Sequence, residues 1–161
     1  GRVFVFDAGG TLVGTIATKG TGTAQLFSPV GLAVDPVAQE VLVADWGDFG
    51  NTSNPTAYIK IFKYDGTWVA SISGAGRCGM MGCTGGFSRP GSPVAANGRV
   101  FVPDVILASV LVFDRATGRL ETSLGSRAQM RIPTDVVALG DDLVVTSART
   151  GEVVRLPGGA P

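Results

Sequence analysis

Residues 3–13 read VFVFDAGGTLV, and the same pattern returns at residues 59–69 (IKIFKYDGTWV) and at residues 110–120 (VLVFDRATGRL). In each copy a short apolar run leads into a turn that contains glycine, and a second short run follows. Internal repeats of this kind determine the architecture of a chain more strongly than any local pattern does.

A second phrase recurs between these copies, in which a proline precedes a short apolar run. The runs follow Pro29, Pro90 and Pro133 and read GLAV (31–34), PVA (93–95) and VVA (136–138). Together the two phrases give many short runs rich in Val, Ile, Leu and Phe, bounded by Gly, Pro, Asp or Asn. Because turn signals return every ~8–12 residues and no stretch has helical periodicity, the sequence predicts an all-β fold.

The repeat unit contains four predicted strands. In the first full copy they cover residues 30–35, 40–45, 57–64 and 67–73, and in the second copy residues 92–96, 99–103, 109–114 and 120–124. Asn97-Gly98 and Asp65-Gly66 are typical of the tight turns that join antiparallel strands. The N-terminus adds the last two strands of a preceding copy, and the C-terminus adds the first three strands of a following copy.

Four-stranded antiparallel units of about 40–45 residues, repeated along a chain, are the blades of a β-propeller. We therefore predict a single partial propeller domain over residues 1–161, with two full blades, two partial blades and an incomplete ring. Its blade pieces are residues 1–26, 27–86, 87–131 and 132–161. Extra residues at 46–56 and 74–86 follow the second and fourth strands of the first full blade. Both insertions should therefore emerge on one face, and long loops on a rigid scaffold are where binding usually resides.

The first full blade resembles the NHL-repeat family of β-propellers. The likeness rests on Phe27 and on residues 29–35 (PVGLAVD), 41–45 (VLVAD) and 59–66 (IKIFKYDG). It weakens in the second blade, where Pro103-Asp104 replaces Ala-Asp, and in the last, where Ser147 replaces the aspartate. The resemblance implies a disc of about six blades, of which this chain would hold at most three or four. It also implies a protein-binding or ligand-binding disc.

An open propeller would leave two uncovered sheet faces and unpaired strand edges, which favour association with other chains. We expect the chain to be a fragment, to pair with a second copy into a ring, or to complete a ring with a different chain. The chain begins at Gly1 and not at methionine, which suggests a processed form, an excised piece or a partial sequence.

The composition narrows the possible functions. Hydrophobic residues make up 45% of the chain and charged residues 16%, which indicates a globular domain with a core. Thirteen basic residues balance thirteen acidic ones, so we expect no binding to nucleic acid and no insertion into a membrane. No apolar run approaches the ~20 residues of a membrane-spanning helix. Histidine is absent, which excludes His-based triads, His-ligated zinc and His-ligated haem.

The only two cysteines lie in the segment CGMMGC at residues 78–83. We expect a disulfide between Cys78 and Cys83, which on the chain-entropy model would contribute roughly 2 kcal/mol. A disulfide implies an oxidising, extracytoplasmic compartment such as the periplasm, the cell surface or the medium, and a bacterial setting fits it. The alternative is a soft-metal site in which two thiolates and the thioethers of Met80 and Met81 hold copper(I).

Polar and aromatic side chains gather around the two insertions. The candidates for binding a partner are Trp46, Asp48, Phe49, Asn51, Arg77 and Arg89, since aromatic and arginine side chains are preferred interface anchors. The competing interpretation is that Trp46 and Phe49 fold back over the blade edge. Asp45, Asp48 and Asn51 could also offer oxygen ligands to calcium, although a bidentate glutamate is missing. Asp45 sits where aspartate commonly accepts hydrogen bonds from turn amides.

Phenylalanine recurs at fixed positions of the repeat, which favours packing between blades over any role in ligand binding. The predicted core phenylalanines are Phe6, Phe27, Phe62, Phe87 and Phe113.

These features together favour a non-catalytic extracytoplasmic scaffold, without a cofactor, that binds a protein or ligand through the loops of one face. It could serve as a subunit of a larger surface assembly. The alternative is a fragment of a calcium-dependent propeller lactonase, which needs inward-facing Glu, Asp and Asn. The glutamates of this chain, Glu40, Glu121 and Glu152, lie instead at strand starts or in an outer strand. Amidating lyases of related fold use histidine, which this chain lacks. RNA-binding propellers need a basic face, and the basic and acidic residues of this chain are equal in number, so neither function is favoured.

Overall fold

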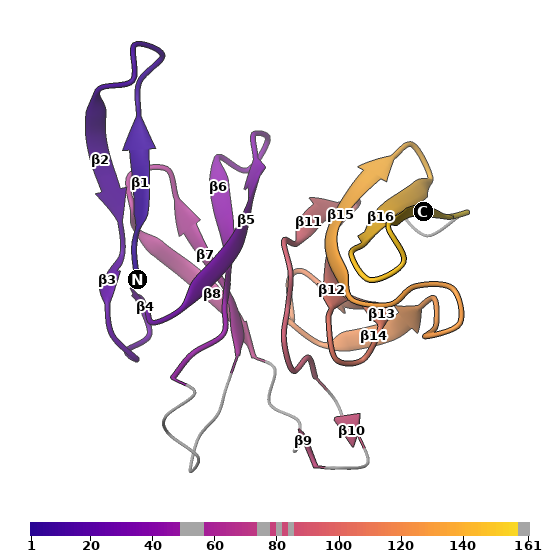
Figure 1. The fold of residues 1–161 in the computed structure, drawn as a ribbon. Coiled ribbons are helices and arrows are strands. Elements are labelled where there is room, and N and C mark those ends of the chain that lie inside the picture. Colours follow the sequence, from indigo (N-terminus) through magenta and orange to yellow (C-terminus); the bar gives the residue numbers. More distant parts are fainter. Residues whose placement is uncertain (49–56, 74–77, 80–81, 84–85, 158–161) are drawn as a thin grey trace.

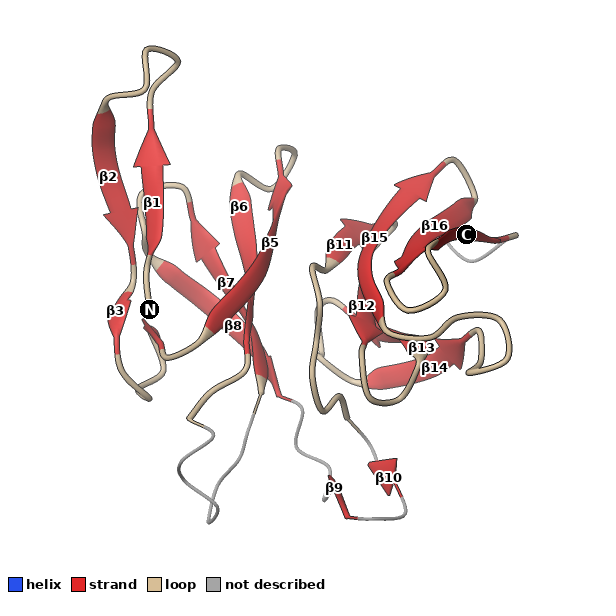
Figure 2. Ribbon diagram, viewed as in Figure 1, coloured by secondary structure: helices blue, strands red, loops and turns tan. Residues whose placement is uncertain are grey.

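The computed structural model of the chain describes residues 1–48, 57–73, 78–79, 82–83 and 86–157. All regular structure in these residues is β-strand, and they contain no helix (Figure 2). Accordingly, the described residues include no helix that could cross a membrane. The all-β fold predicted from the repeats is confirmed.

Two four-stranded antiparallel sheets form the centre of the molecule (Figure 1). The first blade consists of β5 (Pro29–Asp35), β6 (Glu40–Asp45), β7 (Tyr58–Lys63) and β8 (Trp68–Ser73). The second blade consists of β11 (Val94–Ala96), β12 (Arg99–Asp104), β13 (Ser109–Asp114) and β14 (Leu120–Leu124). Within each blade the strands pair in sequence order, as predicted for propeller blades.

Partial blades lie at both ends of the chain. The N-terminal half-blade consists of β1 (Val3–Phe6) and β2 (Leu12–Ile16), and the C-terminal part-blade of β15 (Pro133–Leu139), β16 (Asp142–Ser147) and β17 (Glu152–Leu156). They correspond to strands three and four of one blade and to strands one to three of another. Figure 1 shows the half-blade and the part-blade at opposite sides of the molecule, so the ring is not closed.

Two short strand pairs lie outside the blades. β3 (Thr18–Lys19) and β4 (Gln25–Leu26) pair in parallel in the link between the half-blade and the first blade, which the sequence did not predict. β9 (Cys78–Gly79) and β10 (Gly82–Cys83) pair in antiparallel fashion within the second insertion.

The strand boundaries agree with the repeat pattern to within a few residues. Asn97 and Gly98 both have positive φ angles, 50° and 73°, as the tight turn predicted between β11 and β12 requires. The predicted strand over 92–96 is shorter than expected, because Pro93 has no N–H to donate to the ladder. Ser92 instead forms a parallel bridge with Asp135 of the part-blade.

The two ends of the blades differ. Pro29, Asp45, Tyr58 and Ser73 are register partners at one end of the first blade, from which both insertions depart. We call this end the loop face. The opposite end carries only short turns, such as that between Asp35 and Glu40, and we call it the turn face. The prediction that both insertions emerge on one face is confirmed.

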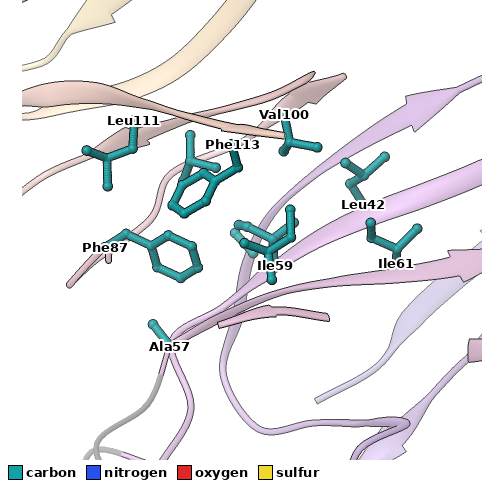
Figure 3. Close-up of a cluster of buried hydrophobic side chains, with 11 residues drawn as sticks. Leu42, Ala57, Ile59, Ile61, Phe87, Val100, Leu111 and Phe113 are labelled. Atoms are coloured by element: carbon teal, nitrogen blue, oxygen red, sulfur yellow. The ribbon is translucent and has the colours of Figure 1, made fainter. Parts of the chain in front are cut away.

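The core lies between the blades. One layer joins Leu42, Ile59 and Ile61 of the first blade to Val100 and Phe113 of the second (Figure 3). Phe87 completes it with its ring edge-on to that of Phe113, at 5.5 Å between centroids and 76° between planes. A second layer joins the second blade to the part-blade, and a third joins the half-blade to the first blade. The same repeat positions thus form the core at each interface.

One predicted core residue is not buried. Phe62, Phe87 and Phe113 are buried as expected, and Phe27 is half-buried, but Phe6 is 58% exposed. The prediction for Phe6 is wrong because the side chain lies on the outward face of the half-blade, where no described residue forms a covering blade.

Candidate binding face

Trp46 links the first blade to the second at the loop face. It follows β6 directly, and its backbone N–H donates to Ser28 O at 3.0 Å. Its indole Nε1 donates to Pro90 O, at 2.8 Å, in the segment that enters the second blade. The half-buried ring therefore rests against the neighbouring blade while part of it stays accessible to a partner.

Arg89 lies against the same ring. Its guanidinium carbon is 5.4 Å from the centroid of the Trp46 ring, which is cation–π geometry. Two of the predicted partner-binding residues, which lie 43 positions apart in the sequence, are thus brought together where two blades meet. The indole thus packs against the adjoining blade, as one of the two interpretations predicted, while a role of Trp46 in binding a partner stays a prediction.

Asp45 is hydrogen-bonded through its carboxylate to backbone amides around it. It is 1% exposed, and its carboxylate accepts hydrogen bonds from the amides of Phe27, Ser28 and Gly47 at 2.7 to 3.2 Å. The carboxylate therefore fastens the segment that enters β5 to the end of β6. This contact pattern is that of a structural turn aspartate.

The same fastening recurs in the later blades. Asp104 accepts hydrogen bonds from the amides of Ser88, Arg89, Ile106 and Leu107. In the part-blade, Ser147 Oγ accepts from Arg131 N at 2.9 Å and donates to Arg131 O at 2.7 Å. A hydroxyl can thus replace the carboxylate of the repeat because it ties down the same entering segment with one donor and one acceptor.

The remaining predicted residues of this face form no metal cluster in the described structure. Asp48 is half-buried at the edge of the first insertion. Phe49, Asn51 and Arg77 lie outside the described residues. Within the described ranges, no three Asp, Glu, Cys or His side chains lie close enough together to hold a metal ion.

Lys60 is a buried cation that the sequence analysis missed. It is 3% exposed, and its Nζ donates to Gly22 O at 2.8 Å and also to Gln25 O. Burial lowers the pKa of this lysine, and the nearby Asp45 carboxylate opposes that shift. The available signal was a lysine at a repeat position that holds Leu111 in the second blade.

The ammonium group of Lys60 ties β4 and the loop before it to the first blade. It also lines a shallow cavity of about 420 Å³, together with Tyr58, Trp68 and Ser71. Two of the three N–H donors of the Lys60 ammonium group bond to backbone carbonyls. These bonds give Lys60 a structural role.

The turn face is held by an ion cluster between blades. Arg115 of the second blade donates to Asp35 Oδ2 at 2.6 Å and to Glu40, both in the first blade. Lys63 also donates to Glu40, at 2.8 Å. In the described part of the chain, Arg89 at the loop face and Arg115 at the turn face thus both contact the first blade from the second.

The two cysteines are paired in the backbone of the second insertion. Cys78 and Cys83 are directly opposite register partners in the β9–β10 hairpin. Their side chains lie outside the described structure, and so do Met80 and Met81. The structure therefore tests neither the disulfide nor the soft-metal alternative.

Comparisons with known proteins bear on the fold. No family model matches the chain, and no curated protein matches it in sequence. Among solved structures it is similar to a chain of the nidogen/laminin complex, with 20% identity and a TM-score of 0.58. That match covers 82% of this chain and 44% of the other. It is also similar to a protein of unknown function from Bacteroides caccae, with 13% identity and a TM-score of 0.58. That match covers 97% of this chain and 54% of the other.

These similarities concern architecture alone, because both identities are low. The chain spans about half the length of the solved structures it matches. What it shares with them is a β-propeller-like fold of four-stranded antiparallel blades, here with a ring that is not closed.

Proposed function

We propose that this chain is a non-catalytic scaffold that binds a protein partner through its loop face. The observation that carries this proposal is the Trp46–Arg89 pair, which sits where two blades meet; in the sequence Trp46 begins the first insertion and Arg89 follows the second. Tryptophan and arginine dominate the energetics of protein interfaces, particularly when a rigid scaffold holds them in place. One structural neighbour was solved as a nidogen/laminin complex, which agrees with a binding role.

We further propose that the blades are of the NHL type and that a protein partner or a second copy completes the ring. The NHL assignment rests on the sequence of the first full blade, in which Pro29, Asp45 and Gly66 hold the motif positions. Completion from outside is supported by the apolar side chains exposed on the outward faces of the two partial blades, which include Phe4, Phe6 and Val153.

The chemistry of the described residues favours binding over catalysis. Glu40, the glutamate nearest to the two full blades' interface, is ion-paired with Arg115 and Lys63. Glu121 is ion-paired with Arg99 in the outer part of the second blade. Neither glutamate is therefore placed to hold calcium in a central channel, as a propeller lactonase would require.

The binding proposal is tested by photo-cross-linking from the two faces. A benzophenone amino acid replaces Asp48 at the loop face or Tyr64 at the turn face, and the full chain is irradiated in extract of its source cells. We expect one dominant protein adduct from position 48 and none from position 64. Adding Trp46→Ala and Arg89→Ala should remove the adduct, whereas Trp68→Ala and Arg119→Ala should not. Equal adducts from both positions would contradict the proposal, and calcium bound to the purified protein would support the hydrolase alternative.

We propose an extracytoplasmic location on the basis of the two cysteines. Register partners in an antiparallel hairpin have Cα atoms about 4.5–5.5 Å apart, within the range that a disulfide spans. Replacing Cys78 and Cys83 by serine should lower the free energy of unfolding by roughly 2 kcal/mol, with strand content unchanged. Non-reducing alkylation followed by mass spectrometry should find no reactive thiol in the original chain. Loss of a bound metal in the variant would contradict the disulfide.

A further inference from the structure

The shallow cavity beside Lys60 lies at the outer strands of the first blade, on the side that faces the half-blade. Its walls are residues 21–23 of the link that follows the half-blade, Tyr58 and Lys60 of β7, and residues 68–71 of β8. Among the described residues, none from the inner strands β5 and β6 lines it. Its volume of about 420 Å³ is within the range of pockets that hold small molecules.

The charge of Lys60 is buried in the wall of this cavity without an ion-pair partner. Its bonds to Gly22 O and Gln25 O use two N–H donors, and no described residue accepts from the third. The nearby Asp45 carboxylate bonds to backbone amides instead, and no other described carboxylate forms an ion pair with Lys60. Neutral carbonyl oxygens do not balance the charge, so an anion in the cavity would stabilise the ammonium group.

Two aromatic side chains and a hydroxyl line the cavity together with this ammonium group. Lys60 Nζ lies 5.2 Å from the centroid of the Tyr58 ring. Trp68 forms another part of the wall, and its Nε1 donates to Ser71 Oγ at 3.2 Å. Ser71 is the register partner of Lys60, so both side chains lie on the same face of the blade. The cavity therefore combines a buried cation with a hydroxyl and two aromatic surfaces.

The second blade has a cavity at the same repeat positions, but it lacks this chemistry. That cavity has a volume of about 700 Å³. The strand registers align the positions of Tyr58, Lys60 and Trp68, in that order, with Ser109, Leu111 and Leu120, all of which line it. The packing of the repeat thus accounts for a cavity at this place in each full blade. It does not account for the cation and the two aromatic rings, which belong to the first blade alone.

From this geometry we propose that the cavity beside Lys60 binds a small aromatic carboxylate. The carboxylate accepts a hydrogen bond from the third N–H of Lys60 and balances its charge. The aromatic body of the ligand packs against Tyr58 and Trp68. This site shares no residue with the Trp46–Arg89 pair of the loop face, so it adds a small-molecule site to the proposed binding of a protein partner.

The test titrates β-naphthoate into the full chain and compares it with β-naphthamide, which has the same shape and no charge. Isothermal titration calorimetry should show one site that binds the carboxylate about tenfold more tightly than the amide, or tighter still. Lys60→Met keeps an unbranched side chain but removes the charge, and it should lower the affinity for naphthoate by about tenfold. The matched control is Lys63→Met, in the same strand but on its opposite face, which should leave the affinity unchanged.

A second measurement uses the original chain and needs no variant. In NMR spectra of the chain with labelled lysine, the Cε signal of Lys60 should shift as naphthoate saturates its site, and those of Lys19 and Lys63 should not. Equal affinity for the carboxylate and the amide, no saturable binding at millimolar concentration, or an unmoved Lys60 signal would overturn the proposal. Trp68→Ala should weaken naphthoate binding about threefold or more, whereas Trp46→Ala should not. Because the photo-cross-linking is expected to respond to Trp46 and not to Trp68, the two proposals fail independently.

Discussion

The interfaces inside this molecule and the faces at its two ends are built from the same repeat, yet only the inner ones are buried. Phe62 and Phe113 are 0% and 1% exposed, whereas Phe6 at the same repeat position is 58% exposed. At the other end Val153 is 67% exposed, although its counterparts Ile59 and Val110 are fully buried. An apolar residue in a propeller repeat thus indicates that a neighbouring blade belongs there, and it does not show that the chain itself supplies that blade.

The largest difference should appear when matched phenylalanines are truncated. Phe113→Ala removes a buried ring between two blades and should lower the free energy of unfolding by about 3–5 kcal/mol. Phe6→Ala removes a ring that is mostly solvated and should change it by less than about 0.5 kcal/mol. Urea unfolding followed by circular dichroism measures both. Equal losses at a protein concentration where the chain is monomeric would mean that Phe6 is covered within a single chain, which would break the comparison.

A second contrast concerns the side chains that fasten each blade to its entering segment. Asp104→Ala removes the acceptor of four partly buried backbone amides and should cost about 3 kcal/mol of stability. Ser147→Ala, at the same position of the part-blade, removes two hydrogen bonds to the backbone of Arg131 and one from the Thr150 hydroxyl, and should cost about 1–2 kcal/mol. The same urea experiment applies. A larger effect at Ser147 would show that the part-blade is anchored as firmly as the full blades.

The smallest effect should come from the ion cluster at the turn face, and it should depend on pH. The pKa of Asp35 is lowered because the amide of Ala38 donates to it and because Arg115 lies beside it. A lowered pKa in the folded state means stability that is present above the unfolded pKa and is lost as pH falls through the folded pKa. Asp35→Asn should therefore lose less stability than the original chain when the pH falls below about 4.

The measurement is a series of urea midpoints over this acidic range. Asp142→Asn is the matched control, because its partner Arg155 lies in the same part-blade and not across a blade interface. If the urea midpoints of Asp35→Asn and of the original chain fall in parallel with pH, the pKa of Asp35 is not lowered by folding and the prediction is contradicted.

The sequence predicted what repeats within a blade. The four-strand order, the Asn97-Gly98 turn and the position of both insertions follow from local pattern, because turn residues and strand runs act over short distances. The loop face was predicted for the same reason. Trp46 and Arg89 were both identified as candidates, but their contact depends on how two blades pack, which the repeat does not encode.

The features that sequence reasoning missed are those that break the repeat. Lys60 stands in an apolar position, and its buried ammonium group donates to carbonyl oxygens of Gly22, in the loop before β4, and of Gln25, in β4 itself. The parallel pairing of β3 with β4 has no counterpart among the described residues of the other blades and their links. The contact of Arg115 with Asp35 and Glu40 joins residues far apart in the sequence. Phe6 was assigned to the core because its repeat position is buried wherever a neighbour exists.

The central claim, that the end faces are blade interfaces left uncovered by the chain, is tested most directly by the native mass in solution. Light scattering on non-reduced protein would compare the original chain with a Phe6→Lys and Val153→Lys variant over a range of concentrations. The account predicts a mass above 16.4 kDa that grows with concentration for the original chain, and a monomer with unchanged strand content for the variant. A monomer of 16.4 kDa for the original chain at every concentration would contradict it.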